Sequence, residues 1–175
     1  PKAEEQGAVM MTWLNNQLAD QTRPRLQERG ITDLDAEAWY KFQTFLDIMR
    51  EIVETGEGMT PTLVAVGKGV VANLPLDKFA TMDDFKGFVL ALHHTTTRNT
   101  PDTENIFIHE ADGHLYMLNN TPVSNDILYG FFWELLRKAK IGGKRYTLAP
   151  HEDYPSAEVG SIFQVKLLNP KAFGY

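Results

Sequence analysis

The sequence contains no cysteine among its 175 residues. Disulfide bonds, thiolate metal ligands and a cysteine nucleophile are therefore excluded. A cytoplasmic location is the expectation that fits this absence, because disulfides are rare in that compartment.

Long hydrophobic runs and basic stripes are also missing. No stretch approaches the ~18–20 consecutive apolar residues of a membrane span, and Pro1-Lys2-Ala3-Glu4-Glu5 lacks the apolar segment of a signal peptide. The 17 basic residues are outnumbered by 23 acidic ones, which gives a net charge of −6. The dense basic run Arg137-Lys138-Ala139-Lys140 closes an expected helix, where cations complement the helix dipole. We expect neither a membrane span nor nucleic-acid binding, which depends on neutralising phosphates.

The motifs of common enzyme classes are absent as well. There is no G-x-S-x-G elbow, and the glycine pair around Lys68 lacks the spacing of phosphate-binding loops. Asp83-Asp84 fits a helix cap better than a catalytic carboxylate pair. His93 and His94 are adjacent, so on a helix they point about 100° apart and do not readily chelate one metal ion. We expect no enzyme and no metal site.

The composition is that of a globular protein, with 43% hydrophobic and 23% charged residues. We expect a single domain over 1–175, with a core at 36–168 and a candidate interaction arm at 1–30. Apolar spacing predicts a helix from Val9 that ends before Pro24, and a second helix over 38–53. Thr60-Pro61 opens a third helix, for which the frequent valines leave a strand as the alternative. A capping box over 81–84 opens a fourth helix, which ends at His93-His94.

The last third of the chain has the clearest pattern. Residues 106–110 and 115–118 flank Asp112-Gly113, a strong hairpin signal. A two-residue turn there would place Ile108 opposite Met117 and His109 opposite Tyr116. A helix capped by Ser124 or Asn125 follows, and then strands at 145–149 and 160–168. The fold class is therefore α+β, with N-terminal helices followed by a β-β-α-β-β antiparallel sheet unit.

Polar and aromatic side chains are expected to converge where the fourth helix ends beside the hairpin. A mostly apolar cavity with a few polar groups is the usual form of a small-molecule site. Simple packing of the same aromatics between sheet and helices is the alternative. The candidate ligand-binding residues are His93, His94, Arg98, Phe107, His109, Tyr116 and Phe131.

The same element order resembles the 4-vinyl-reductase-like superfamily, which includes bacterial small-molecule domains, TRAPP transport-complex subunits and haem-nitric-oxide-binding domains. The resemblance covers about residues 36–168. It is carried by four segments, namely Gly67-Lys68-Gly69-Val70, His93-His94-Thr95 with Arg98-Asn99, Asn119-Asn120-Thr121-Pro122, and Asp126 with Gly130.

The resemblance implies a regulatory or sensory ligand-binding role, often as a dimer. Two departures limit it. The cysteines that many such domains carry are absent, so a cysteine-based metal site does not transfer. The Tyr-x-Ser-x-Arg motif of haem-nitric-oxide-binding domains is absent too, which disfavours haem and leaves the cofactor unknown.

Two hypotheses follow. The first is a non-enzymatic sensor or binding module for a small, largely apolar ligand. The alternative is a structural or protein-protein interaction subunit without a ligand, docking a partner or a second copy through Trp13, Trp39 and their neighbours. A closed cavity favours the first hypothesis, and an exposed Trp39 favours the second.

Overall fold

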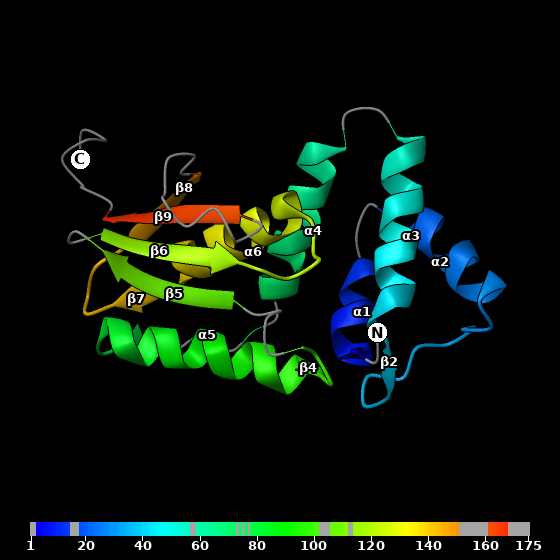
Figure 1. The fold of residues 1–175 in the computed structure, drawn as a ribbon, viewed down its shortest axis with the longest axis horizontal. Helices are drawn as coiled ribbons and strands as arrows, with labels where there is room; N and C mark the ends of the chain where they lie inside the picture. The colour runs from blue at the N-terminus through cyan, green and yellow to red at the C-terminus, as the bar shows by residue number, and fades with distance from the viewer. Residues whose placement is uncertain are drawn as a thin grey trace.

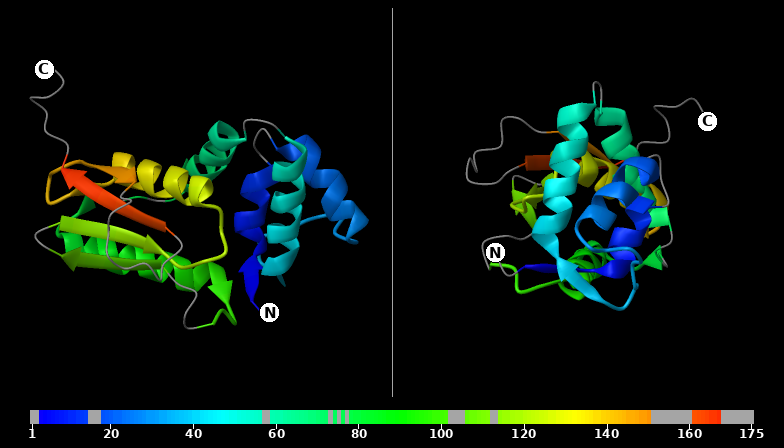
Figure 2. Two further views of the ribbon diagram at one scale, coloured as in Figure 1. Left: turned by 45° about the horizontal axis from the view of Figure 1, so that its top comes forward. Right: turned by 90° about the vertical axis from the view of Figure 1, so that its right-hand side faces the viewer.

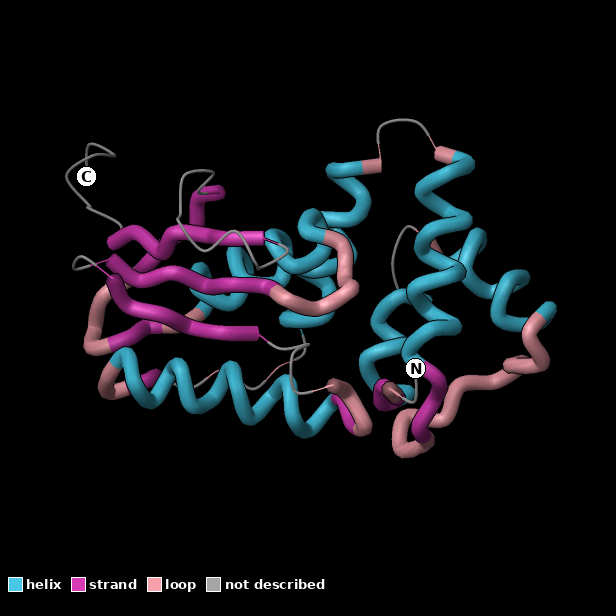
Figure 3. Tube along the Cα trace, viewed as in Figure 1, coloured by secondary structure: helices cyan, strands magenta, loops and turns pink. Residues whose placement is uncertain are grey.

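A four-stranded antiparallel sheet with its helices and a separate group of N-terminal helices make up the computed structural model (Figures 1 and 3). The structure describes residues 3–14, 18–56, 59–72, 74, 76, 78–101, 106–111, 114–150 and 161–167. The α+β class expected from the sequence is confirmed. No helix within these ranges is both long and apolar enough to cross a bilayer.

The N-terminal helices are α1 (Gly7–Leu14), α2 (Ala19–Glu28) and α3 (Phe42–Thr55). They bury one hydrophobic cluster between them, to which Met10, Leu18 and Phe45 contribute side chains that are 1% exposed. A small sheet closes the base of this group: β1 (Glu4–Gln6) lies between β2 (Trp39–Lys41) and β4 (Thr97–Arg98). β1 therefore joins the N-terminal helices to the segment that follows α5.

One helix in this region was not predicted, and one helix prediction was wrong. The first helix ends before Pro24, at Leu14, but Pro24 itself lies inside a second helix, α2, where none was expected. The missing N–H of a proline costs one helical hydrogen bond, and burial of Thr22 and Leu26 on either side favours continuing the helix. The helix expected over 38–53 begins only at Phe42, since residues 39–41 pair with β1 as a strand.

The helices around the main sheet follow the sequence more closely. α4 (Thr60–Ala72) is a helix rather than the alternative strand. α5 (Met82–Thr96) begins with the predicted capping box, in which the Asp84 N–H donates to Thr81 Oγ1 at 3.1 Å and the Thr81 N–H donates to Asp84 Oδ2 at 2.9 Å. α6 (Asn125–Lys138) has Ser124 as its N-cap, although the serine side chain makes no capping hydrogen bond.

The main sheet has the strand order β5-β6-β9-β8. Its strands are β5 (Ile106–Ala111), β6 (His114–Asn119), β8 (Tyr146–Pro150) and β9 (Ser161–Leu167). The predicted register is confirmed, with Ile108 opposite Met117 and His109 opposite Tyr116. The predicted turn at 112–113 lies outside the described residues. Two short strands, β3 (Lys78–Phe79) and β7 (Lys140–Ile141), pair in parallel beside this unit.

The larger hydrophobic core lies between the main sheet, α5 and α6. Phe132 of α6 packs edge-on against Phe163 of β9, with ring centroids 6.1 Å apart. Figures 1 and 2 show α5 running beside β5, so that its end points toward the N-terminal helices. This arrangement places the end of α5 at the junction between the two halves of the molecule.

Candidate functional site

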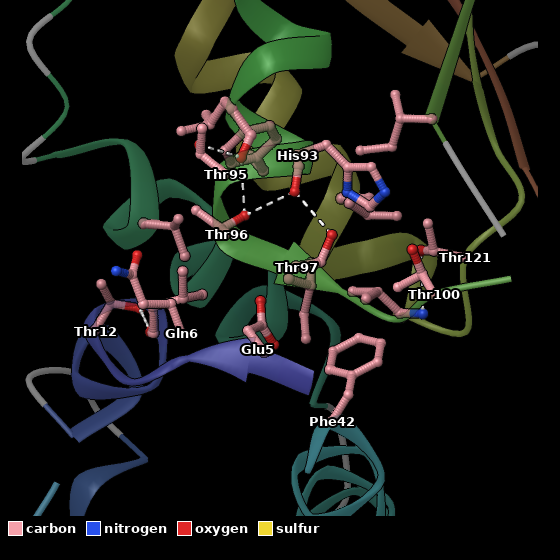
Figure 4. Close-up of a pocket in the computed structure, with 18 of the residues that line it drawn as sticks. Glu5, Gln6, Thr12, Phe42, His93, Thr95, Thr96, Thr97, Thr100 and Thr121 are labelled. Atoms are coloured by element: carbon pink, nitrogen blue, oxygen red, sulfur yellow. Dashed lines mark hydrogen bonds between the residues drawn. The ribbon is translucent and has the colours of Figure 1, made fainter. Parts of the chain in front are cut away.

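A cavity of about 470 Å³ lies at that junction. Its walls come from β1 and α1 on one side and from α4, α5 and α6 on the other (Figure 4). Most of the lining is apolar, including Val9, Val70, Leu92 and Phe131. The volume falls within the ~300–1,000 Å³ that is usual for small-molecule and cofactor sites.

Several threonines of the lining look polar but donate their hydroxyl protons to neighbouring oxygens of the protein. Thr12 Oγ1 donates to the Val9 carbonyl at 2.5 Å, and Thr96 Oγ1 to the Leu92 carbonyl at 2.9 Å. Thr97 and Thr121 donate in the same way to the His93 carbonyl and to Asn119 Oδ1. Because their protons are taken, these threonines present mainly methyl groups and oxygen lone pairs to an occupant.

Glu5 differs from these threonines. It pairs with Tyr40 on one side and Thr97 on the other through the β1 backbone, and its residue is 9% exposed. Its carboxyl rises from β1 into the cavity (Figure 4) and forms no hydrogen bond or ion pair with any described residue. Burial without a partner raises the pKa of this carboxyl to about 8, since desolvation disfavours the charged form.

The two adjacent histidines in the last turn of α5 have different surroundings. His93 is half-buried and lines the cavity, whereas His94 lies outside the lining. Their ring centroids are 5.6 Å apart, with an angle of 53° between the ring planes. Of the two histidines, His93 therefore lies in the cavity wall.

The cavity brings together only two of the seven predicted site residues, His93 and Phe131. Arg98 lies beside the cavity, where its guanidinium stacks 4.4 Å from the Trp39 ring and its Nε donates to Glu4 Oε2 at 2.7 Å. Trp39 is accordingly half-buried, and the side chain of Trp13 lies outside the described residues.

The other predicted site residues belong to the hairpin. Tyr116 is 7% exposed within the sheet, opposite His109, and Phe107 is 42% exposed on β5. Ligand binding by these side chains stays a prediction.

Glu5 was not predicted as a site residue. Because Glu4 and Glu5 are adjacent charged residues, the pair looks like solvent-exposed surface in the sequence. The only signal is alternation: Ala3 and Glu5 are buried whereas Glu4 is half-buried, as in a strand with one buried face. Three residues are too few for that period to be recognised. Among the described residues, no group of three or more His, Asp or Glu lies close enough to hold a metal ion.

Comparison with known proteins identifies the fold. No protein-family model and no curated protein matches the chain. Several solved structures do, and they are H-NOX domains. One, solved in a study of H-NOX activation, has a TM-score of 0.61 at 13% identity and covers 94% of this chain and 97% of its own. An H-NOX mutant from T. tengcongensis gives 0.57 at 10% identity, covering 93% and 94%. An Fe(II) unliganded H-NOX mutant from K. algicida gives 0.54 at 11%, covering 96% and 99%.

These neighbours correct the expectation that haem is disfavoured. A further H-NOX structure of the same fold comes from work on haem distortion, and another similar structure comes from work on haem redox potential and porphyrin distortion. Haem was disfavoured because the Tyr-x-Ser-x-Arg motif is absent. The similarity in fold to haem-binding structures overturns that expectation. At 10–15% identity the similarity establishes the fold, and a role for haem in this chain depends on its own residues.

Those residues meet the main requirements of a haem site. The cavity is largely apolar and of cofactor size, and one histidine lies in its wall. Histidine is a common axial ligand of haem iron. None of the described lining residues is Lys or Arg, so the cavity has no internal cation for the haem propionates. The features of the cavity that suit haem are therefore its apolar walls and His93.

Proposed function

We propose that this chain is a sensor domain that binds haem in the cavity between β1, α1, α4, α5 and α6, with His93 as the axial ligand. The single observation that supports this most strongly is the placement of His93. It is the lining histidine of an apolar cavity about 470 Å³ in volume, in a chain whose fold is that of H-NOX domains.

The position of His93 suits an axial ligand. It sits in the last turn of α5, and the Thr97 hydroxyl donates to its backbone carbonyl at 2.8 Å, while that of Thr96 lies 3.3 Å from the same oxygen. These contacts fix the backbone that carries the imidazole. When bound, haem iron would supply an open coordination position for a small gas molecule, and the surrounding cavity would decide which molecule is held.

In this role the protein binds the haem, excludes water from it and passes on a change in conformation when the occupant of the cavity changes. The cavity is built from both halves of the molecule, since β1 and α1 precede α4, α5 and α6 in the chain and belong to the N-terminal group. An occupant that fits one state of this junction better than another would shift the balance between states. We propose a sensory, non-enzymatic role on this ground.

Titration of the purified protein with haemin, followed by absorbance, tests the proposal. The expected result is saturation at one haemin per chain, with a Soret band distinct from that of free haemin. The band should change on reduction and again on adding carbon monoxide. A spectrum that stays that of free haemin would overturn the proposal in favour of an interaction subunit without a ligand.

A further inference from the structure

Two neighbouring glutamates on β1 have opposite surroundings. Glu4 accepts from Arg98 Nε at 2.7 Å and from Asn99 Nδ2 at 3.1 Å. Glu5 has no such partner among the described residues and is 9% exposed, with its carboxyl inside the cavity (Figure 4). The sequence thus places one carboxylate in an ion pair and the next in an apolar pocket.

No charged group of the described residues near Glu5 is positioned to stabilise its ionised form. On β2, the Tyr40 hydroxyl accepts a backbone N–H outside the cavity, and Lys41 is exposed. On β4, Arg98 is bound to the neighbouring glutamate. From α5 the titratable lining residue is His93, and α1 and α3 contribute none to the described lining. Burial raises the pKa of the Glu5 carboxyl to about 8 with no opposing cause, so this group carries its proton at neutral pH.

We propose that Glu5 is the hydrogen-bond donor of the cavity: its protonated carboxyl donates to an acceptor atom of a small uncharged molecule bound there, and ionisation of Glu5 removes that bond. The proposal rests on the proposed function, because the small molecule is taken to be a gas held beside haem. It deepens that function by naming the group that selects for acceptor-bearing gases.

A neutral occupant with an acceptor atom fits the cavity better than a cation does. The hydroxyls of Thr12, Thr96, Thr97 and Thr121 donate to protein oxygens, so they have no proton for a ligand acceptor. The Glu5 O–H is buried and has no acceptor among the described residues, which is the condition under which a hydrogen bond to a ligand is most favourable. Gln6 and Thr100 also line the cavity, but they are half-buried and less shielded from water than Glu5.

Carbon monoxide on the reduced, haem-loaded protein is the probe. Its C–O stretching frequency falls when a donor approaches its oxygen, and it can be recorded at pH 6.5 and pH 9.5. Glu5→Gln keeps an N–H donor that does not titrate. Glu5→Leu has a similar volume and no donor. Glu4→Gln is the matched control, because Glu4 is the neighbouring carboxylate on β1, lies outside the cavity lining and is bound to Arg98.

The unaltered protein should show the lower frequency at pH 6.5 and a rise at pH 9.5. Glu5→Leu should show the higher frequency at both pH values, with carbon monoxide dissociating about two- to tenfold faster, the size of one hydrogen bond. Glu5→Gln should lose the pH dependence, and Glu4→Gln should behave as the unaltered protein.

One frequency for all variants at both pH values, in protein that has bound haemin, overturns the assignment of Glu5 and leaves the proposed function standing. Absence of a bound-haem spectrum in the unaltered protein overturns both. A frequency that changes with pH equally in Glu5→Leu points to another titrating group and also overturns the assignment. If Glu5→Leu does not fold, Glu5→Gln decides the matter, because it keeps a donor at this position and a pH dependence that survives in it overturns the assignment.

Discussion

Gly67 of α4 and Gly130 of α6 meet at the closest approach of the two helices. A Cβ atom on Gly67 would lie 1.9 Å from the Ile127 carbonyl oxygen, and one on Gly130 would lie 2.0 Å from the Val64 carbonyl oxygen. Each glycine therefore faces the backbone of the opposite helix, and the contact is reciprocal. Both helices also line the cavity, so this contact sets the width of one of its walls.

Replacing either glycine by alanine should destabilise the protein. Gly67→Ala or Gly130→Ala has to push the helices apart, and overpacking of this kind typically lowers the free energy of unfolding by about 1–3 kcal/mol, sometimes more. Gly69→Ala on the same helix is the control, since no atom lies within 4 Å of its Cβ and alanine favours a helix by up to ~1 kcal/mol. Urea unfolding of the three variants measures this. Equal stability of Gly67→Ala and Gly69→Ala would contradict the close contact.

His93 and His94 should differ sharply in haem binding. His93→Gly removes the imidazole in the cavity wall and is expected to weaken haemin binding on the order of tenfold or more. Added imidazole should restore the Soret band. His94→Gly is the control because His94 lies outside the cavity lining. The same loss in both variants would rule out His93 as the specific ligand.

The stability of the ligand-free protein should depend on Glu5 in a defined direction. The pKa of Glu5 is raised from 4.5 to about 8 by burial, so between these two pH values the unfolded chain loses a proton that the folded chain keeps. The free energy of unfolding therefore falls as pH rises through this window, by a few kcal/mol, and the loss levels off above about pH 8. Melting temperatures at pH 5, 7 and 9 should show a steeper decline for the unaltered protein than for Glu5→Gln.

Glu4 should affect the pH dependence of the free energy of unfolding in the opposite direction from Glu5. The hydrogen bond from Arg98, together with its charge and the hydrogen bond from Asn99, lowers the pKa of Glu4 despite some desolvation. The stabilisation from Glu4 is present above its ordinary pKa and is lost as pH falls through the lowered value. Glu4→Gln should therefore remove an acid-side decline in stability and leave the decline toward pH 8 intact. If both variants change the same part of the pH profile, the assignment of the two carboxylates is wrong.

The two helix caps should also be distinguishable. Thr81→Ala removes a side chain that accepts from the Asp84 N–H, at a typical cost of about 1 kcal/mol. Ser124 occupies the cap of α6 but makes no capping hydrogen bond with its side chain, so Ser124→Ala should change the free energy of unfolding less. Thermal unfolding of the two variants side by side measures the difference, and an equal loss would contradict the contrast in cap geometry between α5 and α6.

The sequence allowed much of the fold to be predicted where local signals agree. The hairpin register followed from alternation on both sides of a turn pair, and the α5 cap from Thr81 and Asp84. β1 and β2 could not be predicted, because strands of three residues show too little of their period. The apolar spacing that begins near Trp39 continues into the helix α3. Residues 39–41 nevertheless pair with β1, so this tertiary pairing outweighs the local helical pattern.

The site was harder to predict than the fold. His93 and Phe131 line the cavity, and both lie on long periodic helices whose faces can be assigned from spacing. The hairpin residues were predicted from a face shared across the register, but Phe107, His109 and Tyr116 do not line this cavity, and ligand binding by them stays a prediction. Glu5 was missed because its burial depends on a partner strand that lies far away in the sequence.

That distant pairing has a consequence for synthesis on the ribosome. Glu5 leaves the exit tunnel before Thr97, its neighbour across the sheet, which is added after all of α5. Until then β1 has no β4 to pair with, and the buried acid stands in water with its ordinary acidity. The cavity therefore cannot exclude water until α5 and β4 have emerged, and its α6 wall follows later still.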